Sequence, residues 1–236
     1  MKITDKKIKS KIKIGEAFAV VENIKYPEFS CENHEKHEKL CSRMNAFYAS
    51  VAEKYSNHAR TELPKRIRRK KIACKLPMVL AMNYTIGLCD ENVIGVVIDL
   101  TFSEGKNIKM RRFSQMWSVG KGNILSVGEI MKTDRESRKK IHSLILKIAK
   151  ENGETGTFGY FGDYLPRLSK RLDIRNFFVV PNGLCFFVNA GVLSPVKYGA
   201  SNFVLSFDSL ADVLKDDFLP KMGKKEAQNG NIVNNV

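Results

Sequence analysis

The sequence lacks any long apolar run. No stretch approaches the roughly 18 consecutive apolar residues that a membrane-spanning helix needs. The basic residues 1–13 are not followed by the apolar segment of a signal peptide. These two absences predict a cytoplasmic protein without a membrane span. The five cysteines are an odd number without regular paired spacing, which favours reduced thiols in a non-oxidising compartment.

Sequence motifs of common enzymes are also missing. The chain has neither a Gly-x-Ser-x-Gly elbow nor a phosphate-binding loop of the Walker type. The glycine-dense segment 153–162 follows a helical pattern rather than a strand, which indicates a connection. Asp99 is the one carboxylate for which we predict burial, and a single buried carboxylate is more often a structural hydrogen-bond acceptor than an acid catalyst. We expect a protein that is not an enzyme and that uses no cofactor.

Positive charge, by contrast, is abundant. The 236 residues include 40 Lys and Arg against 25 Asp and Glu, which gives a formal net charge of +15. Such an excess predicts either an anionic partner or a solvated lysine-rich surface.

The densest basic run extends from Lys65 to Lys71. It is interpreted either as a solvated linker or as a contact site for nucleic acid or another anion, although it holds no aromatic residue for stacking on bases. The candidate binding residues are Lys65, Arg66, Arg68, Arg69, Lys70 and Lys71.

Cys31, His34, His37 and Cys41 form the sharpest cluster of potential metal ligands. On a helix, the last three share one face, and two imidazoles with two thiolates satisfy tetrahedral zinc. However, four ligands from one continuous helix rarely surround one ion, and His37 falls close to an apolar stripe. We therefore predict no metal site and keep the four residues as candidates.

The order of the predicted elements indicates an α+β fold. Apolar residues recur at steps of three and four within 32–57 and 134–150, which predicts two helices. Runs of strands with helices between them favour an antiparallel sheet with helices packed on one side. The predicted strands are 16–26, which we expect Pro27 to end, and then 78–88, 93–102, 107–117 and 203–207.

The phenylalanine-rich segment 176–189 contains the strongest local signal. Two short apolar segments flank Pro181-Asn182-Gly183, and Asn-Gly between such segments predicts a hairpin. Because side chains alternate across a strand, each Phe pair sends one ring to each face of the sheet. The rings at 177, 178, 186 and 187 are core residues if both faces are covered and a partner-binding patch if one is bare. We favour the core.

We expect one two-part domain at 14–217, divided into 14–131 and 132–217. Residues 1–13 are a basic arm that either extends a strand or stays loose. The tail at 221–236 is rich in Asn, Gly and Lys, which predicts disorder.

Several short segments resemble a known bacterial family. These are Ile24-Lys-Tyr-Pro27, 113–125, 176–183, Phe186-Phe-Val188, Ser194-Pro195 and 203–210. They are similar to the domain found outside the membrane in the lysozyme-sensing anti-sigma factor of Gram-positive bacteria. A similar domain precedes the catalytic domain of some peptidoglycan deacetylases.

The resemblance implies an α+β domain outside the membrane that acts as a non-catalytic recognition module. We expect it to bind a protein or a cell-wall-type polysaccharide through a sheet face or an edge strand. The alternative is a cytoplasmic protein that binds nucleic acid or another anion through residues 65–71.

Overall fold

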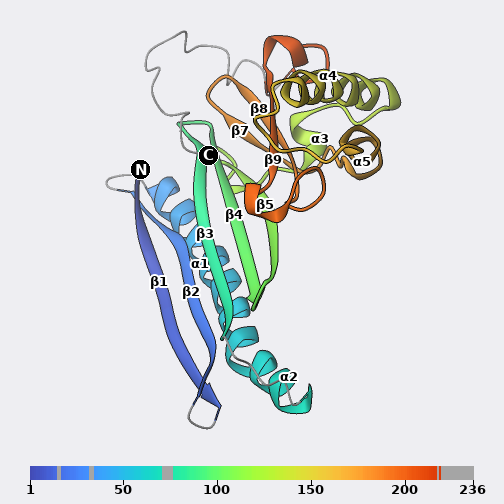
Figure 1. Cartoon of the computed structure of the whole chain (residues 1–236). Helices are drawn as coiled ribbons and strands as arrows, with labels where there is room; N and C mark the ends of the chain where they lie inside the picture. Colours follow the sequence, from blue (N-terminus) through green and yellow to red (C-terminus); the bar gives the residue numbers. More distant parts are fainter. Residues whose placement is uncertain (15–16, 32–34, 71–76, 217, 219–236) are drawn as a thin grey trace.

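The computed structural model describes residues 1–14, 17–31, 35–70, 77–216 and 218. The described residues form a large sheet of six strands and a small sheet of three. Figure 1 shows helices packed on both sheets. The α+β class is therefore confirmed. The small sheet lies over one end of the large sheet, and its own outer face is covered by helices.

The strands of the large sheet follow one another in sequence order. Residues 2–14 take the strand alternative of our prediction and pair with the next strand along their length. Neighbouring strands are antiparallel except β2 and β3, which are parallel, because the helical connection between them returns the chain to its starting end. The sheet is therefore mixed rather than purely antiparallel. The strands are β1 (Lys2–Ile14), β2 (Ala17–Ser30), β3 (Met78–Cys89), β4 (Val93–Glu104), β5 (Asn107–Ser118) and β6 (Asn123–Ile124).

Strand β2 continues through Pro27, although we predicted that Pro27 ends it. The backbone N–H of Phe29 donates to Asn45 Oδ1 (2.8 Å), and its C=O accepts from Asn45 Nδ2 (2.9 Å). Because alternate residues of a strand direct their backbone groups to the same side, the nitrogen of Pro27 also faces away from β1. The pairing with β3 ends at Ile24, so the missing N–H costs no ladder hydrogen bond.

Three consecutive helical segments connect β2 to β3: α1 (Glu35–Asn57), the π-helix η1 (His58–Glu62) and α2 (Leu63–Lys70). The predicted apolar stripe of α1 is buried against the large sheet, with Leu40 1% exposed and Met44 and Tyr48 fully buried. The predicted basic connection is in fact helix α2. Leu63 and Ile67, four residues apart, are 2% and 6% exposed, so one face of α2 is anchored in the same core.

The most deeply buried carboxylate of this layer belongs to Glu22, not to Asp99 as we predicted. Glu22 on β2 is 1% exposed and accepts hydrogen bonds from Ser56 Oγ (3.0 Å) and from Arg60 Nε and Nη2 (3.2 and 3.0 Å). The side chain of Asp99 keeps 28% exposure. Because Arg60 belongs to η1, this ion pair ties the end of the long helix to β2.

The predicted phenylalanine-rich hairpin is present in the small sheet. Strand β7 (Phe177–Val180) pairs with β8 (Gly183–Val188) across the loop Pro181–Asn182, and β8 pairs with β9 (Ser201–Ser206). A Cβ atom on Gly183 would lie 2.0 Å from the carbonyl oxygen of Leu205, so this glycine permits close approach of β9. The remaining elements are α3 (Val127–Ile130), α4 (Arg135–Glu154), α5 (Tyr164–Arg171) and the 3₁₀ turns η2 (Val196–Tyr198) and η3 (Asp208–Leu210).

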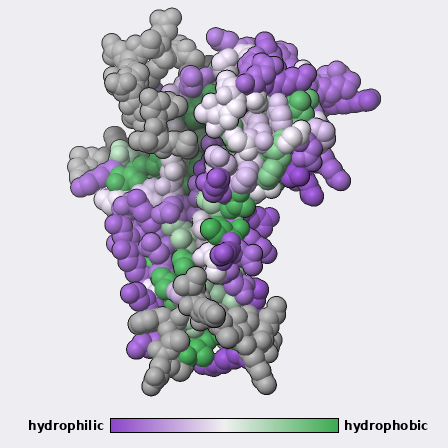
Figure 2. All heavy atoms as spheres, viewed as in Figure 1, coloured by the Kyte–Doolittle hydropathy of each residue, from purple (hydrophilic) through white to green (hydrophobic). Residues whose placement is uncertain are grey.

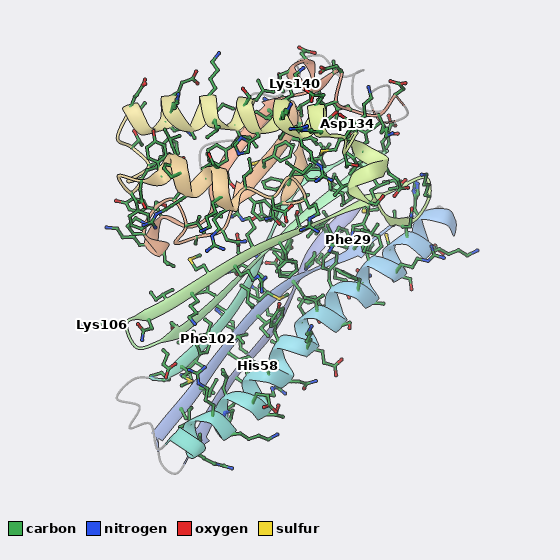
Figure 3. The ribbon with its side chains drawn as sticks, turned by 90° about the vertical axis from the view of Figure 1, so that its right-hand side faces the viewer. Phe29, His58, Phe102, Lys106, Asp134 and Lys140 are labelled. Carbon is green, nitrogen blue, oxygen red and sulfur yellow. The ribbon has the colours of Figure 1, made fainter. Side chains whose placement is uncertain are left out.

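All four phenylalanines of the hairpin are core residues, as expected. Phe177 and Phe186 pack toward α4 and α5, whereas Phe178 and Phe187 pack between the two sheets with Val97 and Cys185. Figure 3 shows the resulting order of layers, from α1 through the large sheet and the small sheet to α4. Each sheet thus carries its helices on one side, and the two long helices cover different sheets.

Two glycines allow the sheets to meet. A Cβ atom on Gly87 of β3 would lie 2.4 Å from the carbonyl oxygen of Val179 and 2.7 Å from the Phe178 ring. A Cβ atom on Gly95 of β4 would lie 2.8 Å from Val179 Cγ1. Strand β7 therefore crosses the large sheet so closely that a residue larger than glycine does not fit at positions 87 and 95.

We expect Gly87→Ala to lower the free energy of unfolding by about 1–3 kcal/mol, because the new methyl group overpacks against backbone. Denaturant unfolding measures the change. Gly128→Ala is the matched control, since nothing lies within 4 Å of its added Cβ and alanine favours the helix. Equal stability of the wild type and Gly87→Ala would contradict the described contact.

Candidate functional site

No described element covers the face of the large sheet opposite α1 at the end that the small sheet does not reach. Strand register places ten side chains there in two rows that cross five strands. We call these ten residues the open face. They are Lys11, Val21, Val79, Ser103 and Ile108 in one row and Lys9, Asn23, Ala81, Thr101 and Met110 in the other.

The extent of the open face follows from where the small sheet sits. Strand β7 contacts β3, β4 and β5, and α1 packs on the opposite face of the large sheet. In the view of Figure 1, α1 lies behind the strands. Figure 2 has the same view and shows apolar atoms at the surface along the middle of the lower half, between hydrophilic flanks.

The chemistry of the open face changes from one side to the other. Lysines occupy the β1 side, short side chains such as Ala81 and Thr101 occupy the centre, and Ile108 and Met110 occupy the β5 side. Ile108 is 48% exposed, which is high for a large apolar residue. The face therefore combines a basic margin with an apolar margin.

A polar latch separates the open face from the junction of the two sheets. Arg112 on β5 donates from Nε and Nη2 to the two carboxylate oxygens of Asp99 (2.8 and 2.7 Å) and from Nη1 to Asn202 Oδ1 of β9 (2.8 Å). Its backbone N–H donates to Asn189 Oδ1 (2.6 Å). The Arg112 side chain is only 10% exposed. These bonds therefore join the two sheets where water is largely excluded and a bidentate ion pair is strong.

The side chains of the predicted basic run differ in whether a carboxylate pairs with them. Lys65 pairs with Glu62 (3.1 Å), and Arg66 pairs with Glu104 (3.0 Å). Arg68 is exposed, and no carboxylate within the described residues pairs with it. The side chains of Arg69, Lys70 and Lys71 lie outside the described residues. Whether the run binds an anion stays a prediction.

The structure describes three of the four candidate metal ligands. Burial, and then the neighbouring thiol of Cys31, raises the pKa of Cys41 to about 12, which disfavours the thiolate that zinc needs. His37 lies in α1, and His34 lies outside the described residues. Across the ranges that the structure describes, no three His, Cys, Asp or Glu side chains are arranged to hold a metal ion.

The sequence carries a signal for the open face that our sequence analysis missed. Residues 93–98 of β4 are buried without interruption, as expected for a strand covered on both faces. From Asp99 onward, polar residues alternate with Leu100 and Phe102. The change from a continuous to an alternating pattern marks the point where one face loses its cover.

None of the helices in the described part of the chain has the length and apolar character of a membrane span. No family model matches the sequence, and no curated protein matches it.

Two solved structures from the DUF3298 family, a bacterial domain family of unknown function, have a similar fold. The member from Bacteroides fragilis NCTC 9343 matches 95% of this chain and 98% of its own, with a TM-score of 0.67 and 15% identity. The member from Pseudomonas aeruginosa PAO1 matches 92% of this chain and 97% of its own, with a TM-score of 0.60 and 10% identity. At these identities the similarity shows the shared fold.

We expect Arg112→Leu to lower the free energy of unfolding by about 1–3 kcal/mol, because Asp99 and Asn202 lose a charged partner. Denaturant unfolding measures the change, and Arg175→Leu is the control variant. Arg175 makes an equivalent two-pronged pair with Asp173 (2.9 and 2.7 Å), but its side chain is 75% exposed, so its loss should leave the unfolding midpoint almost unchanged. Equal effects of the two variants on the free energy of unfolding would contradict the claim that Arg112 holds the two sheets together.

Proposed function

We propose that the chain is a non-catalytic recognition module that binds a protein or a cell-wall-type polymer through the open face. The observation that carries the proposal is the set of ten side chains that crosses five strands without cover from any described element. Five strands about 4.8 Å apart span roughly 19 Å. That width suits the surface of a folded partner or several units of a polymer.

The short side chains of the open face favour binding over internal packing. Short side chains project little from the sheet, as at Ala81, Thr101 and Ser103. A partner can therefore approach the strand backbones closely. The lysines at the β1 margin add to the net charge of +15 and favour an acidic or anionic partner.

The family resemblance supports the choice of partner class. The segments that resemble the lysozyme-sensing domain lie partly in β2 and β5, where they follow the open-face residues of these strands rather than include them. The solved structures with a similar fold belong to a family of unknown function. A lysozyme and insoluble peptidoglycan are therefore the first protein and polymer probes.

The alternative function, anion binding through residues 65–71, ranks second. Lys65 and Arg66 are each paired with a carboxylate, which reduces the charge that the run offers to a phosphate backbone. A salt titration separates the two modes. Binding through the open face should weaken mildly with salt, whereas binding through the run should weaken steeply and depend on Arg68.

We expect Thr101→Arg to weaken binding to the lysozyme or to the peptidoglycan by about tenfold or more. The long charged side chain would stand in the centre of the open face and hold the partner away. Calorimetry measures lysozyme binding, and co-sedimentation measures peptidoglycan binding.

Ser143→Arg is the control variant for this experiment. It makes the same change in size and charge at an exposed position on α4, and it should bind like the wild type. The proposal fails if the wild type binds neither probe, or if Thr101→Arg and Ser143→Arg bind equally well.

A further inference from the structure

Strand β5 presents an open backbone edge near its beginning. Strand β6 has two residues and pairs only with Trp117 and Ser118 of β5. Beyond that point, Met116 O accepts from Leu125 N (2.7 Å), and Arg112 N donates to Asn189 Oδ1 (2.6 Å). These bonds show that the even-numbered residues of β5 direct their backbone groups away from β4.

The same alternation leaves the edge unpaired near its beginning. Ile108 and Met110 also direct their N–H and C=O groups outward, and no hydrogen bond within the described residues occupies them. Lys109 and Arg111 direct theirs to β4, where they pair with Phe102 and Leu100. An exposed row of this kind is a template for another strand.

The side chains beside this edge differ between the two faces of β5. On the α1 side stand Lys109 and Arg111, with Lys106 at the tip of the β4–β5 hairpin (Figure 3). These three cations form no ion pair with any carboxylate in the described part of the chain. On the open-face side stand Ile108 and Met110. A strand laid along β5 would therefore meet positive charge on one face and apolar surface on the other.

A groove of about 360 Å³ adjoins the edge. It is lined by Leu100, Phe102, Lys109, Met110, Arg111 and Asn189. Its lining is mainly apolar with two cationic groups, so it suits a side chain that has an aliphatic stem and an acidic end.

The opposite edge of the large sheet, β1, differs in its charges and its apolar residues. Lys6 pairs with Glu28 (3.2 Å), and Lys7 lies 4.0 Å from Asp5. Ile8 and Ile12 pack against the α1 core rather than lying exposed.

We propose that β5 binds an extended peptide in which acidic and apolar residues alternate, by adding it as a further strand beside Ile108 and Met110. The inference rests on the proposed recognition function and names the edge and the partner chemistry. Outward backbone groups supply the hydrogen bonds. Cross-strand contacts place acidic residues opposite Lys109 and Arg111 and apolar residues opposite Ile108 and Met110.

The test uses a fluorescent peptide of alternating Glu and Val, with the Lys and Val analogue as its charge control. Anisotropy should show binding of the Glu peptide alone. Met110→Pro should weaken it by about tenfold or more, because proline removes an outward N–H without breaking the ladder to β4. Lys7→Pro on β1, which also replaces an outward residue on an edge strand but lies outside the open face, should leave binding unchanged.

Two further measurements keep the test decisive if Met110→Pro folds poorly. The double variant Lys109→Glu/Arg111→Glu should lose the Glu peptide and bind the Lys peptide. Hydrogen exchange by nuclear magnetic resonance should show the amides of Ile108 and Met110 becoming protected in the peptide complex. The amides of Lys109 and Arg111 should be protected already without peptide.

The outcomes distinguish this inference from the proposed function. The inference is overturned if the wild type does not bind the Glu peptide, or if Lys7→Pro abolishes binding while Met110→Pro does not. Loss of lysozyme or peptidoglycan binding in Thr101→Arg would leave the recognition function standing in either case. Peptide binding at β5 without binding of those two probes would confine recognition to the edge.

Discussion

The close approach of β7 to β3 and β4 is the constraint on which the rest of the structure depends. Gly87 and Gly95 remove side chains where Val179 crosses the large sheet. The latch between Arg112, Asp99 and Asn202 then holds the small sheet in that position. The small sheet therefore covers β3, β4 and β5 near one end of the large sheet, and no described element covers the same face at the other end.

The bare end joins two surfaces that a partner can use together. Ile108 and Met110 belong to the open face through their side chains and to the free edge of β5 through their backbone. Some basic side chains elsewhere are paired with carboxylates, as in the pairs Lys6–Glu28 and Arg66–Glu104. Lys106, Lys109 and Arg111 lack such partners within the described residues, so they add electrostatic attraction for an acidic partner beside this edge.

Local signals in the sequence predicted local structure well. The stripe through Leu40 and Met44 predicted α1, and the apolar segments around Pro181–Asn182 predicted the β7–β8 hairpin, because both depend on residues that are close in sequence. The burial of Phe177 and its neighbours also followed from strand alternation, once both faces were assumed to be covered.

Features that depend on distant partners were missed. The parallel pairing of β2 with β3 requires the helical connection to return the chain, and the helical state of residues 63–70 depends on a core that receives Leu63 and Ile67. The burial of Glu22 depends on Ser56 and Arg60, which lie more than thirty residues away. The open face itself is defined by where the small sheet stops, although the alternating pattern after Asp99 marks its beginning.

The most direct test of the central claim is a hydrogen–deuterium exchange footprint of the whole protein bound to the lysozyme or to soluble peptidoglycan fragments. Protein without ligand supplies the reference. We expect new protection in β3, β4 and β5 at the end away from the small sheet, with α4 and α5 unchanged. Protection confined to α2 or to α4, with those strands unchanged, would contradict it.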